Sequence, residues 1–441
     1  MINTRDILGM NARNIIYLSR YNKPAGRKVA DHKLLTKSAL QKAKLSTPKL
    51  CRVFRKPEEI DKFDFINKLP ESFVIKPDNS LGGEGIMVIE KRGKYAGEWI
   101  TSTGDTKSVV DFKLLIQNIL EGQFSMENKP DIAFVEERIR IHPAFEKFCW
   151  NGTPDVGVLV FNRVPVMAYL RLPTKESGGR ANMFQGAIAC GIDMATGITV
   201  HAIKGTHTIN FFPGTKRKLV GIKIPEWEEV LRLAINCQVA IPELGFMRAD
   251  IVLQPSILHP GKTIPTVLEL NAQPGLKIQI ANQVGLRRRL ERVEGLTIED
   301  ADKGIKICKA LFADPQLIAA VSGKKTIGIF ENVEVRSFMG DRVTIKAKVD
   351  TGAFRTSIDE SLARKIGLLS PENIIGEKHY ESALGMDKRL LIDLIFWLGG
   401  RKIKTEANVA DRSKLKRPML IGRRDLTDFI IDPSLDTQLG S

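Results

Sequence analysis

Two apolar stretches in the middle of the chain carry polar residues at regular positions. In residues 267–275, VLELNAQPG, Glu269 and Asn271 alternate with leucines. Alternate side chains of a strand point to opposite faces, so this pattern predicts a strand with both polar side chains on one face. A second strand is predicted at 246–254, FMRADIVLQ, where Asp250 precedes an apolar run. If the two strands are neighbours, the three polar side chains converge.

The same periodicities predict the remaining organisation of the chain. Strand hairpins are predicted at 72–91 and 156–170, and helices at 31–43, 111–121, 226–240 and 283–321. Residues 1–30 are predicted to form a helix and then a loop around Pro24. After 322–325 the pattern changes to short alternating strands, which predicts a separate β domain. The predicted division is a basic N-terminal arm (1–30), an α+β domain (31–300), a helical linker (301–324) and a small β domain (325–436).

The loop of the first hairpin, DNSLGGEG at 78–85, is rich in glycine. Glycines let backbone N–H groups approach and surround a phosphate, because no Cβ stands in the way. The sequence is not a P-loop, since no GK[ST] follows. Lys76 ends the strand before the loop, and Lys33 and Lys37 lie four residues apart on the helix predicted at 31–43. Those two lysines either face a ligand or form a solvated face.

Oxygen ligands suit hard cations such as Mg²⁺, which usually bind one or two carboxylates together with substrate phosphates. Asp250, Glu269 and Asn271 would supply such ligands. The alternative is that each of them simply faces solvent. That explanation suits a single polar residue better than three polar residues in two strands. Arg171, Arg180, Asn182 and several glycines follow the second hairpin, and basic groups in such a loop suit an anionic substrate.

Composition narrows the classes of protein. The net charge is +16 over 441 residues, and residues 1–56 contribute +12 of it. Such a basic segment can bind nucleic acid, an anionic membrane surface, or a ligand as acidic as ATP or polyglutamate. No aromatic stacking pattern accompanies it, so nucleic acid is not favoured. No apolar run approaches the roughly 20 residues of a membrane span, and five scattered cysteines are typical of reduced cytoplasmic thiols.

Residues 1–300 resemble the ATP-grasp ligases, and most closely the alpha-L-glutamate ligase-like proteins related to the RimK ribosomal-protein modifying enzyme. The resemblance is carried by LGMNARN at 8–14, DHKLLTK at 31–37, FVIKP at 73–77, MAYLRLPTKESGGRANMFQGA at 167–187 and LELNAQPGL at 268–276. It implies an α+β ATP-grasp fold, in which two α+β subdomains hold ATP between antiparallel sheets.

The resemblance also implies roles for individual residues. It implies that Lys33 and Lys76 contact the α- and β-phosphates of ATP, and that a flexible loop covers these phosphates with Ser80, Gly82, Gly83 and Gly85. It further implies that the adenine lies against a hinge formed by Glu136, Glu137 and Ile139, and that Asp155 makes a ribose or nucleotide contact. Asp250, Glu269 and Asn271 match ligands of Mg²⁺ or Mn²⁺, and Arg171, Arg180 and Asn182 are expected at the acyl-phosphate site. Two departures are Gly157 and Gln273, which stand where the relatives have arginine.

Residues 325–436 resemble the retropepsin-like aspartic peptidases of the RimB type, a group that carries the name ATP-dependent zinc proteases. DTGA at 350–353 and PMLIGRRDL at 418–426 carry the resemblance, which makes Asp350 the expected catalytic residue. Aspartic proteases share one proton between two close carboxylates, so a single DTG requires a second copy and hence a homodimer. The six histidines are dispersed and no HExxH is present, which gives no basis for a zinc site.

Together these patterns predict a cytoplasmic ligase that uses ATP and Mg²⁺ to join a carboxylate to an amine, with ADP as product. By resemblance, the substrate is an acidic amino acid such as glutamate or a peptide, with a protein or peptide acceptor as a further option. One alternative is a nucleotide-binding regulator of a homodimeric aspartic peptidase that acts on glutamyl peptides. Another is a nucleic-acid-binding protein that uses the basic segment.

Overall fold

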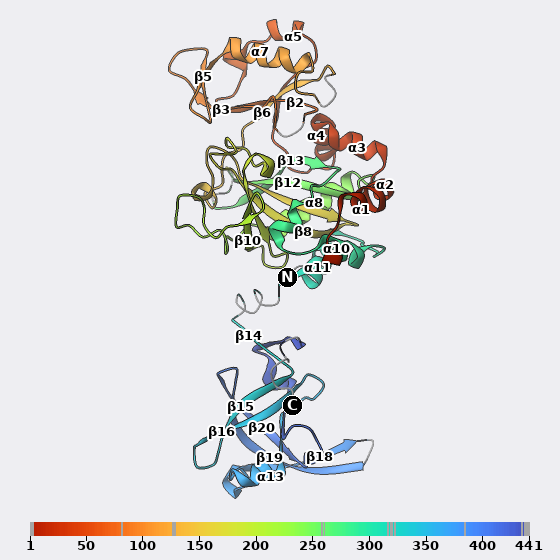
Figure 1. The fold of residues 1–441 in the computed structure, drawn as a ribbon, viewed down its shortest axis with the longest axis vertical. Helices are drawn as coiled ribbons and strands as arrows, with labels where there is room; N and C mark the ends of the chain where they lie inside the picture. Colours follow the sequence, from red (N-terminus) through yellow and green to blue (C-terminus); the bar gives the residue numbers. More distant parts are fainter. Residues whose placement is uncertain are drawn as a thin grey trace. The chain divides into compact units, whose positions relative to one another are not determined.

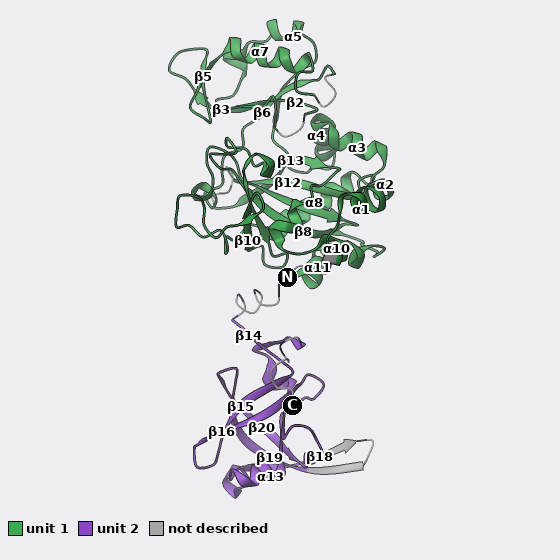
Figure 2. Cartoon of the chain, in the orientation of Figure 1, with its two compact units in different colours: residues 1–313 green, residues 314–441 purple. Residues whose placement is uncertain are grey.

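The computed structural model of the protein describes the chain from residue 4 to residue 435. Its gaps are 81–82, 126–128, 257–258, 260, 315–316, 318–320, 322, 383–384 and 434. The chain divides into unit 1, Met1–Ala313, and unit 2, Asp314–Ser441, which Figure 2 colours separately. Each unit has its own hydrophobic core, and each is described below by itself.

Unit 1 begins with a run of short helices that belongs to its core. These are η1 (Thr4–Asp6), α1 (Met10–Ala12), the π-helix η2 (Arg13–Leu18), α2 (Ser19–Tyr21), α3 (Pro24–Asp31) and α4 (Lys33–Lys42). Leu8 and Tyr17 are buried in the main core cluster. The side-chain amide of Asn22 donates hydrogen bonds to the backbone oxygens of Phe246 (2.7 Å) and Ala272 (2.8 Å). The segment predicted as a basic arm therefore packs against the rest of unit 1.

Pro24 begins a helix, whereas the sequence pattern predicted a loop there. Proline is well suited to the first turn of a helix because its φ is already helical and its missing N–H would have no partner at that position. Helix α3 buries Gly26 and Ala30. Gly26 has no room for a side chain, since a Cβ there would lie 2.7 Å from the carbonyl carbon of Glu243.

The smaller sheet of unit 1 is antiparallel and has six strands. In spatial order they are β1 (Leu50–Phe54), β6 (Ala133–Glu137), β2 (Phe73–Pro77), β3 (Met87–Arg92), β4 (Glu98–Thr101) and β5 (Thr106–Ser108). Short helices α5 (Glu58–Asp61) and α6 (Phe65–Lys68) and the longer α7 (Val109–Leu120) accompany it. Figure 1 labels α5 and α7 on one side of this sheet. Helix α7 buries Phe112, Ile116 and Ile119, which share one helical face. The hairpin predicted at 72–91 is confirmed as the β2–β3 pair.

The larger sheet of unit 1 has seven strands. Their order is β11 (His207–Thr208), β10 (Thr199–Lys204), β9 (Ile188–Ile192), β8 (Val164–Leu172), β7 (Asp155–Phe161), β12 (Phe246–Pro255) and β13 (Thr263–Asn271). All seven residues of β7 are buried, which explains its nearly continuous apolar sequence. Helices α8 (Trp227–Ala240), α9 (Lys277–Asn282), α10 (Leu286–Val293) and α11 (Ala301–Phe312) pack against this sheet. Single helical turns η3 (Glu146–Phe148) and η4 (Met183–Gln185) lie in its connections.

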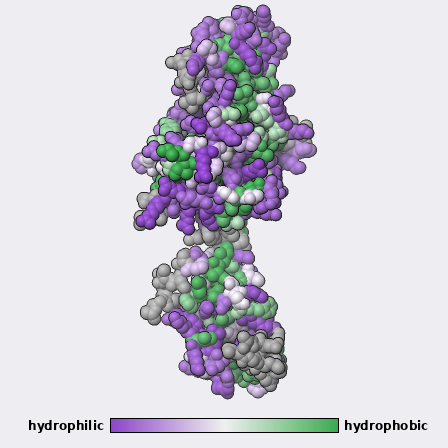
Figure 3. Space-filling model, turned by 90° about the vertical axis from the view of Figure 1, so that its right-hand side faces the viewer, coloured by the Kyte–Doolittle hydropathy of each residue, from purple (hydrophilic) through white to green (hydrophobic). Residues whose placement is uncertain are grey.

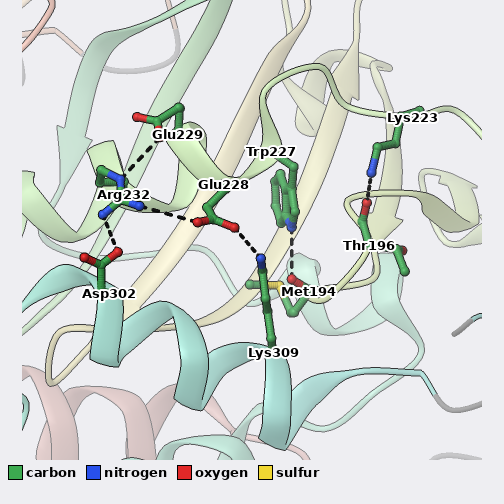
Figure 4. Close-up of polar contacts among 9 residues, drawn as sticks. All are labelled: Met194, Thr196, Lys223, Trp227, Glu228, Glu229, Arg232, Asp302 and Lys309. Atoms are coloured by element: carbon green, nitrogen blue, oxygen red, sulfur yellow. Dashed lines mark hydrogen bonds and ion pairs between the residues drawn. The ribbon is translucent and has the colours of Figure 1, made fainter.

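Helix α11 lies in the segment that the sequence pattern assigned to a linker. Its residues Ile305, Cys308 and Phe312 join the core of unit 1. Ion pairs also connect it to α8, as Figure 4 shows: Lys309 pairs with Glu228, and Asp302 with Arg232. These pairs are exposed, so each adds little stability, and the apolar face holds the helix in place.

Unit 2 is mainly β. Its seven-stranded sheet has the order β15 (Phe330–Arg336), β16 (Arg342–Asp350), β21 (Met419–Gly422), β17 (Ser357–Asp359), β20 (Arg401–Ala410), β19 (Gly385–Leu398) and β18 (Ile374–Ser382). An additional pairing between β15 and β19 closes the sheet into a barrel. Strands β14 (Lys325–Ile327) and β22 (Phe429–Ile431) form a parallel pair, and short helical elements α13 (Glu360–Lys365), η5 (Pro371–Asn373) and η6 (Arg423–Leu426) complete the unit.

Hydrophilic residues cover much of the face drawn in Figure 3. Large apolar side chains are nevertheless exposed at Met10, Ile15, Phe184 and Met339. Within the described ranges, no helix has both the length and the apolar character that a membrane crossing requires.

Candidate functional site

Two lysines share one buried glutamate of the smaller sheet. Lys37 from α4 and Lys76 from β2 each form an ion pair with Glu136 of β6, and the Lys37 Nζ–Glu136 Oε2 distance is 2.9 Å. None of these side chains is more than 10% exposed. The alternative that Lys37 lies on a solvated face is therefore wrong. Burial lowers the pKa of Lys37, and Glu136 opposes that shift. One carboxylate between two ammonium groups leaves a net positive charge, which favours an anion nearby.

Lys33 lies next to the start of the glycine-rich loop. Its Nζ is 3.3 Å from the backbone oxygens of Asp78 and Ser80 and 3.4 Å from the Ser80 hydroxyl. Burial lowers the pKa of Lys33; Glu269 opposes this shift, and Lys76 adds to it. The ammonium group thus lies within the fields of a lysine from the small sheet and a glutamate from the large sheet. Charges from both sheets therefore act on this one ammonium group.

Asp78 organises the beginning of α4, although it was not among the predicted site residues. Its carboxylate accepts a hydrogen bond from the backbone N–H of Leu34 (2.6 Å), and its other oxygen lies 2.8 Å from His32 Nδ1. The carboxylate therefore satisfies a helical N–H that has no partner within the helix, and it favours the positive end of the helix dipole. This contact fixes the helix that carries Lys33 and Lys37.

The described part of the glycine-rich loop contains two glycines with positive φ, Gly83 (+80°) and Gly85 (+69°). A Cβ at Gly85 would lie 2.7 Å from the ring of Phe124, so only glycine fits there. A Cβ at Gly83 would lie 3.7 Å from Cδ of Arg180, which brings the loop beside a residue predicted for the acyl-phosphate site. Gly82, which was predicted to belong to the same cover, lies outside the described residues.

The expected pairing of the two polar strands is confirmed. Strands β12 and β13 are antiparallel neighbours, with Asp250 opposite Glu269 and Arg248 opposite Asn271. Asn271 Nδ2 lies 3.1 Å from Asp250 Oδ2 and 3.5 Å from Glu269 Oε1. The heads of the three predicted metal ligands are therefore within hydrogen-bonding distance of one another.

Two arginines hold the carboxylate of Asp250. Arg248 donates from Nε and Nη2 to its two oxygens, at 2.6 and 2.8 Å, and Arg171 Nη2 lies 2.8 Å from Oδ2. Burial of Asp250 favours its neutral form, but Arg171 and Arg248 outweigh it and hold the pKa well below its usual range. Arg248 was not among the predicted site residues, although it lies two residues before Asp250 and therefore on the same face of the strand.

Arg171 also forms a bidentate pair with Asp155, which faces it across the β7–β8 pair. Its Nε and Nη2 lie 2.6 Å from the two carboxylate oxygens. Burial raises the pKa of Asp155 to about 7, because desolvation and the nearby Asp250 outweigh the attraction of Arg171. Of the two aspartates that share Arg171, Asp155 is thus the one that takes up a proton first.

The remaining residues predicted for unit 1 lie at the end of β6 or in the segments that follow strands. Glu137 ends β6, and its N–H donates to the backbone oxygen of Lys49 at 2.9 Å. Ile139, two residues later, is buried. Asn182 accepts a hydrogen bond from the N–H of Phe184 at 2.9 Å and so begins the turn η4. Their predicted roles at the adenine hinge and the acyl-phosphate site stay predictions.

Asp350 ends β16 in unit 2, where it pairs in parallel register with Gly422 of β21. Its Oδ1 accepts a hydrogen bond from the N–H of Gly352 (3.0 Å), and Lys348 Nζ lies 3.6 Å from its Oδ2. Its side chain is 28% exposed. The aspartate is thus held in a tight turn at the end of a strand and is accessible to a ligand or a second chain.

Residues 12–295 match the sequence model of a family described as sugar-transfer associated ATP-grasp. The chain belongs to this family. Residues 372–438 also match a model described as retropepsin-like aspartic endopeptidase RimB, and this match begins after Asp350. Unit 1 thus contains an ATP-grasp domain, and the two antiparallel sheets of the predicted fold are those described above. The family description does not identify a RimK-type glutamate ligase.

No curated protein matches the chain by sequence. Among solved structures, D-alanine–D-alanine ligase from Bacillus anthracis complexed with ATP is 14% identical, over 65% of this chain and 67% of that chain, with a TM-score of 0.33. The ATP-grasp ligase PsnB complexed with a minimal precursor is 15% identical, over 62% and 63%, also with a TM-score of 0.33. Protein Lpg0085 from Legionella pneumophila, of unknown function, is 18% identical over 25% of this chain and 94% of its own, with a TM-score of 0.17.

The ATP-grasp domain offers a set of oxygen donors for a divalent metal. No group of three or more His, Cys, Asp and Glu side chains that could hold a metal occurs in the described ranges. Asp250 and Glu269 with the amide oxygen of Asn271 supply hard oxygen donors, which suit Mg²⁺ or Mn²⁺ completed by phosphate oxygens and water. Asn271 now directs Nδ2 at the carboxylates, and rotating its amide group would present the oxygen. The residues present therefore fit such an ion.

At position 157, where the relatives have arginine, this domain has no room for a side chain. A Cβ at that position would lie 2.7 Å from the ring of Tyr169 and 3.3 Å from Cδ of Arg248. Tyr169 and Arg248 thus fill the space that a side chain at 157 would need. The domain retains a buried guanidinium group beside position 157, and it comes from β12. Gln273, the other departure, is exposed.

Proposed function

We propose that the ATP-grasp domain is an ATP- and Mg²⁺-dependent ligase that joins a carboxylate to an amine and forms ADP. The substrate carboxylate would take the γ-phosphoryl group of ATP, and the amine would then displace phosphate from the acyl phosphate to form an amide. The observation that carries this proposal is the convergence of Asp250, Glu269 and Asn271 on the larger sheet, with Lys33 within the field of Glu269.

Lys33 and Lys76 would bind and orient the polyphosphate. Lys33 and Lys76 come from different elements, and Glu136 and Asp78 hold the segments that carry them. A bound divalent cation would neutralise charge that develops on the transferred phosphoryl group. Residues Asp250, Glu269 and Asn271 would hold that cation, and Arg171 and Arg180 would orient the acyl group. Catalysis by these groups is mainly positioning and electrostatic stabilisation.

Glutamate is the proposed amino-acid substrate, by the resemblance of the sequence to alpha-L-glutamate ligase-like proteins. A peptide or protein is a further acceptor that the same chemistry allows. The experiment that tests the ligase is phosphate release from Mg-ATP by the full chain, with each amino acid and with polyglutamate. Release that depends on one acid and yields ADP supports the proposal. Tight ATP binding without release under every condition contradicts it.

A second function is favoured by the state of Asp250. Both oxygens of this carboxylate are hydrogen-bonded to arginine, so a cation must compete with two positive charges for it. If these contacts persist when a nucleotide is bound, the domain would bind ATP without ligating. It would then regulate unit 2, and unit 2 would act as a homodimeric aspartic peptidase on glutamyl peptides. Asp350 would then be the catalytic residue, and hydrolysis of a glutamyl peptide that requires Asp350 and responds to ATP would support this function.

A further inference from the structure

Large apolar side chains are exposed near the segment that follows β13. Phe184 of η4 is 81% exposed, and Ile280 of α9 is 41% exposed. In the N-terminal segment of unit 1, Met10 is 69% exposed and Ile7 is 40% exposed. Single exposed apolar residues are normal on a protein surface, whereas several that lie together mark an interaction site. The contacts between the segments that carry them therefore matter.

Reciprocal hydrogen bonds join the N-terminal segment to α9. The backbone N–H of Leu8 donates to Gln279 Oε1 (2.8 Å), and Gln279 Nε2 donates to the backbone oxygen of Leu8 (3.1 Å). Ile7 is the residue before Leu8, and Ile280 is the residue after Gln279. These contacts bring the backbones of the two exposed isoleucines to neighbouring positions, and Met10 follows two residues after Leu8.

Phe184 belongs to the same surface, because a side chain of α9 reaches it. Lys277 Nζ lies 3.8 Å from the centroid of the Phe184 ring. Lys277 and Ile280 are three positions apart in α9, so they lie on one side of the helix. We call the exposed side chains of Ile7, Met10, Phe184 and Ile280 the apolar surface.

The turn that carries Phe184 is fixed by local hydrogen bonds. Asn182 accepts the N–H of Phe184 with its side chain and the N–H of Ala187 with its backbone oxygen (3.1 Å). Gly186 has a φ of +100°, which favours glycine, and its backbone oxygen accepts a hydrogen bond from the Thr174 hydroxyl (3.0 Å). The backbone that presents the phenyl ring is therefore ordered in advance, so a partner would lose little conformational entropy there.

The segments that carry the apolar surface are rich in positive charge. Residues 4–14, 174–187 and 271–288 together contain seven Lys and Arg residues and two acids. None of the seven basic residues is buried. One of the two acids, Glu176, already forms an ion pair with Lys204. Complementary charge favours a partner that is negatively charged around its apolar groups.

Two of these segments adjoin the candidate active site. Arg13 donates from Nη1 to the backbone oxygen of Pro274 (3.0 Å), which lies three residues after Asn271. Asn182, the residue that begins the turn of Phe184, is expected at the acyl-phosphate site. A polypeptide is long enough to contact the apolar surface with one part while another part extends to the site.

Two classes of partner combine negative charge with apolar groups, namely an acidic polypeptide and an anionic lipid surface. Segments that lie on lipid surfaces usually present a broad apolar face along one amphipathic helix. Here the apolar side chains come from three separate elements, the N-terminal segment, η4 and α9, with a cation beside the phenyl ring. This arrangement favours a polypeptide.

We propose that the apolar surface docks an acidic segment of the peptide or protein that supplies the amine. Apolar side chains of this segment would pack against Phe184 and Met10, and its carboxylates would pair with Lys277 and Arg288. The assignment rests on the proposed ligase function and identifies its second substrate as a polypeptide.

The test is binding of a fluorescent peptide to the full chain without ATP, measured by anisotropy, so that it does not depend on turnover. The probe consists of repeated Glu-Leu-Glu-Gly units. In one comparison peptide serine replaces leucine, and in another glutamine replaces glutamate. We expect the probe to bind about tenfold more tightly than either comparison peptide, since each lacks one kind of contact. Equal binding of the serine peptide would show a purely electrostatic contact and overturn the proposal.

Variants connect binding to the apolar surface. Phe184→Ser and Met10→Ser should each weaken binding of the probe about tenfold. Lys277→Gln should weaken it as well and reduce its dependence on salt. Val110→Ser and Lys303→Gln, at exposed positions on α7 and α11, are the matched controls and should change neither property. Thermal unfolding checks that every variant is folded.

The outcomes separate this proposal from the ligase function. Absence of binding, or binding that all three surface variants leave unchanged, would overturn the docking surface even if a free amino acid supports phosphate release. Binding of phosphatidylglycerol vesicles that depends on the same residues, without binding of the probe, would show a lipid surface and overturn the proposal. Probe binding that depends on these residues, without phosphate release under any condition, would overturn the ligase function and support the docking surface alone.

Discussion

Arg248 holds Asp250 through two parallel hydrogen bonds, although the two residues are separated by only one position along β12. Alternate residues of a strand share a face, so the guanidinium group can fold along the strand onto its neighbour. The arginine thereby neutralises a carboxylate that is 1% exposed. The same pair fixes the direction of a predicted metal ligand before any ion is bound.

Removing the arginine should therefore destabilise the protein. Arg248→Met leaves Asp250 buried with Arg171 as its remaining cation, and breaking a buried pair from one side typically costs about 3 kcal/mol or more. We expect a lower free energy of unfolding for unit 1, measured by urea denaturation. Arg232→Met, which removes the exposed ion pairs of α8 with Glu228, Glu229 and Asp302, is the control and should cost less than about 1 kcal/mol. Equal effects of the two changes would contradict the assigned role of Arg248.

Glu269 should matter for turnover and little for folding. Its side chain is partly exposed opposite Asp250, and Glu269→Ala removes one of only two carboxylates of the candidate metal site. We expect a loss of ATP turnover of roughly 100-fold or more, since a catalytic metal contributes several kcal/mol. Phosphate release measures the loss, and thermal unfolding checks the fold. Glu299→Ala is the control; turnover that survives Glu269→Ala would remove this residue from the metal site.

Gly85 should tolerate alanine poorly, and Gly83 should tolerate it better. Both have positive φ, which costs an alanine about 1 kcal/mol, but only at Gly85 would the new Cβ meet the ring of Phe124. We expect Gly85→Ala to cost about 2 kcal/mol or more of unfolding free energy. The double change Gly85→Ala with Phe124→Ala should cost less than the sum of the single changes, which a double-mutant cycle measures. Strict additivity would show that the ring is not the obstacle.

Lys33 should make ATP binding dependent on proton uptake. Burial lowers the pKa of this lysine, so more of it is neutral at alkaline pH than of an exposed lysine with a pKa of about 10.4. An adjacent phosphate favours the charged form and raises the pKa, so nucleotide binding draws a proton from solvent. Calorimetry in alkaline buffers of different ionisation enthalpy measures that proton. Lys33→Met should abolish the uptake, and Lys309→Met should preserve it.

Unit 2 supplies a separate prediction. If it is a peptidase, two copies of Asp350 must approach each other, because the chemistry needs a pair of carboxylates that share one proton. Asp350→Asn should then abolish hydrolysis of glutamyl peptides by the full chain and leave its sedimentation behaviour unchanged. Asp393→Asn, at an exposed position paired with Lys404, is the control. Cleavage by Asp350→Asn, or by a chain that stays monomeric, would falsify the aspartic mechanism.

The sequence predicted those parts of the site that depend on local periodicity. Alternation along β12 and β13 placed Asp250, Glu269 and Asn271 on one face, and the turn-rich loop after Lys76 predicted the first hairpin. What was missed depends on contacts between distant elements. The burial of Lys37 follows from its pairing with Glu136, which lies on a strand almost one hundred residues later.

Some residues are compatible with two local structures, and the sequence alone does not decide between them. Pro24 can interrupt a chain or begin a helix, and only its packing in α3 decides between these outcomes. Arg248 was not predicted, because a metal site is recognised by its oxygen ligands and a cation on the same strand face is not one of them. Asp78 stood within the predicted loop, but its contacts with His32 and Leu34 depend on where α4 begins.

The anchoring of Asn22 has a consequence for how the protein is made. The backbone oxygens that its amide group binds belong to residues 224 and 250 positions further along the chain. During synthesis, the N-terminal helices therefore emerge long before the strands that complete their packing. Contacts of such sequence separation form slowly, because a long loop must be closed first. Until β12 and β13 leave the ribosome, exposed apolar residues of the first helices would be open to chaperones, and unit 1 would complete its fold only near the end of its own translation.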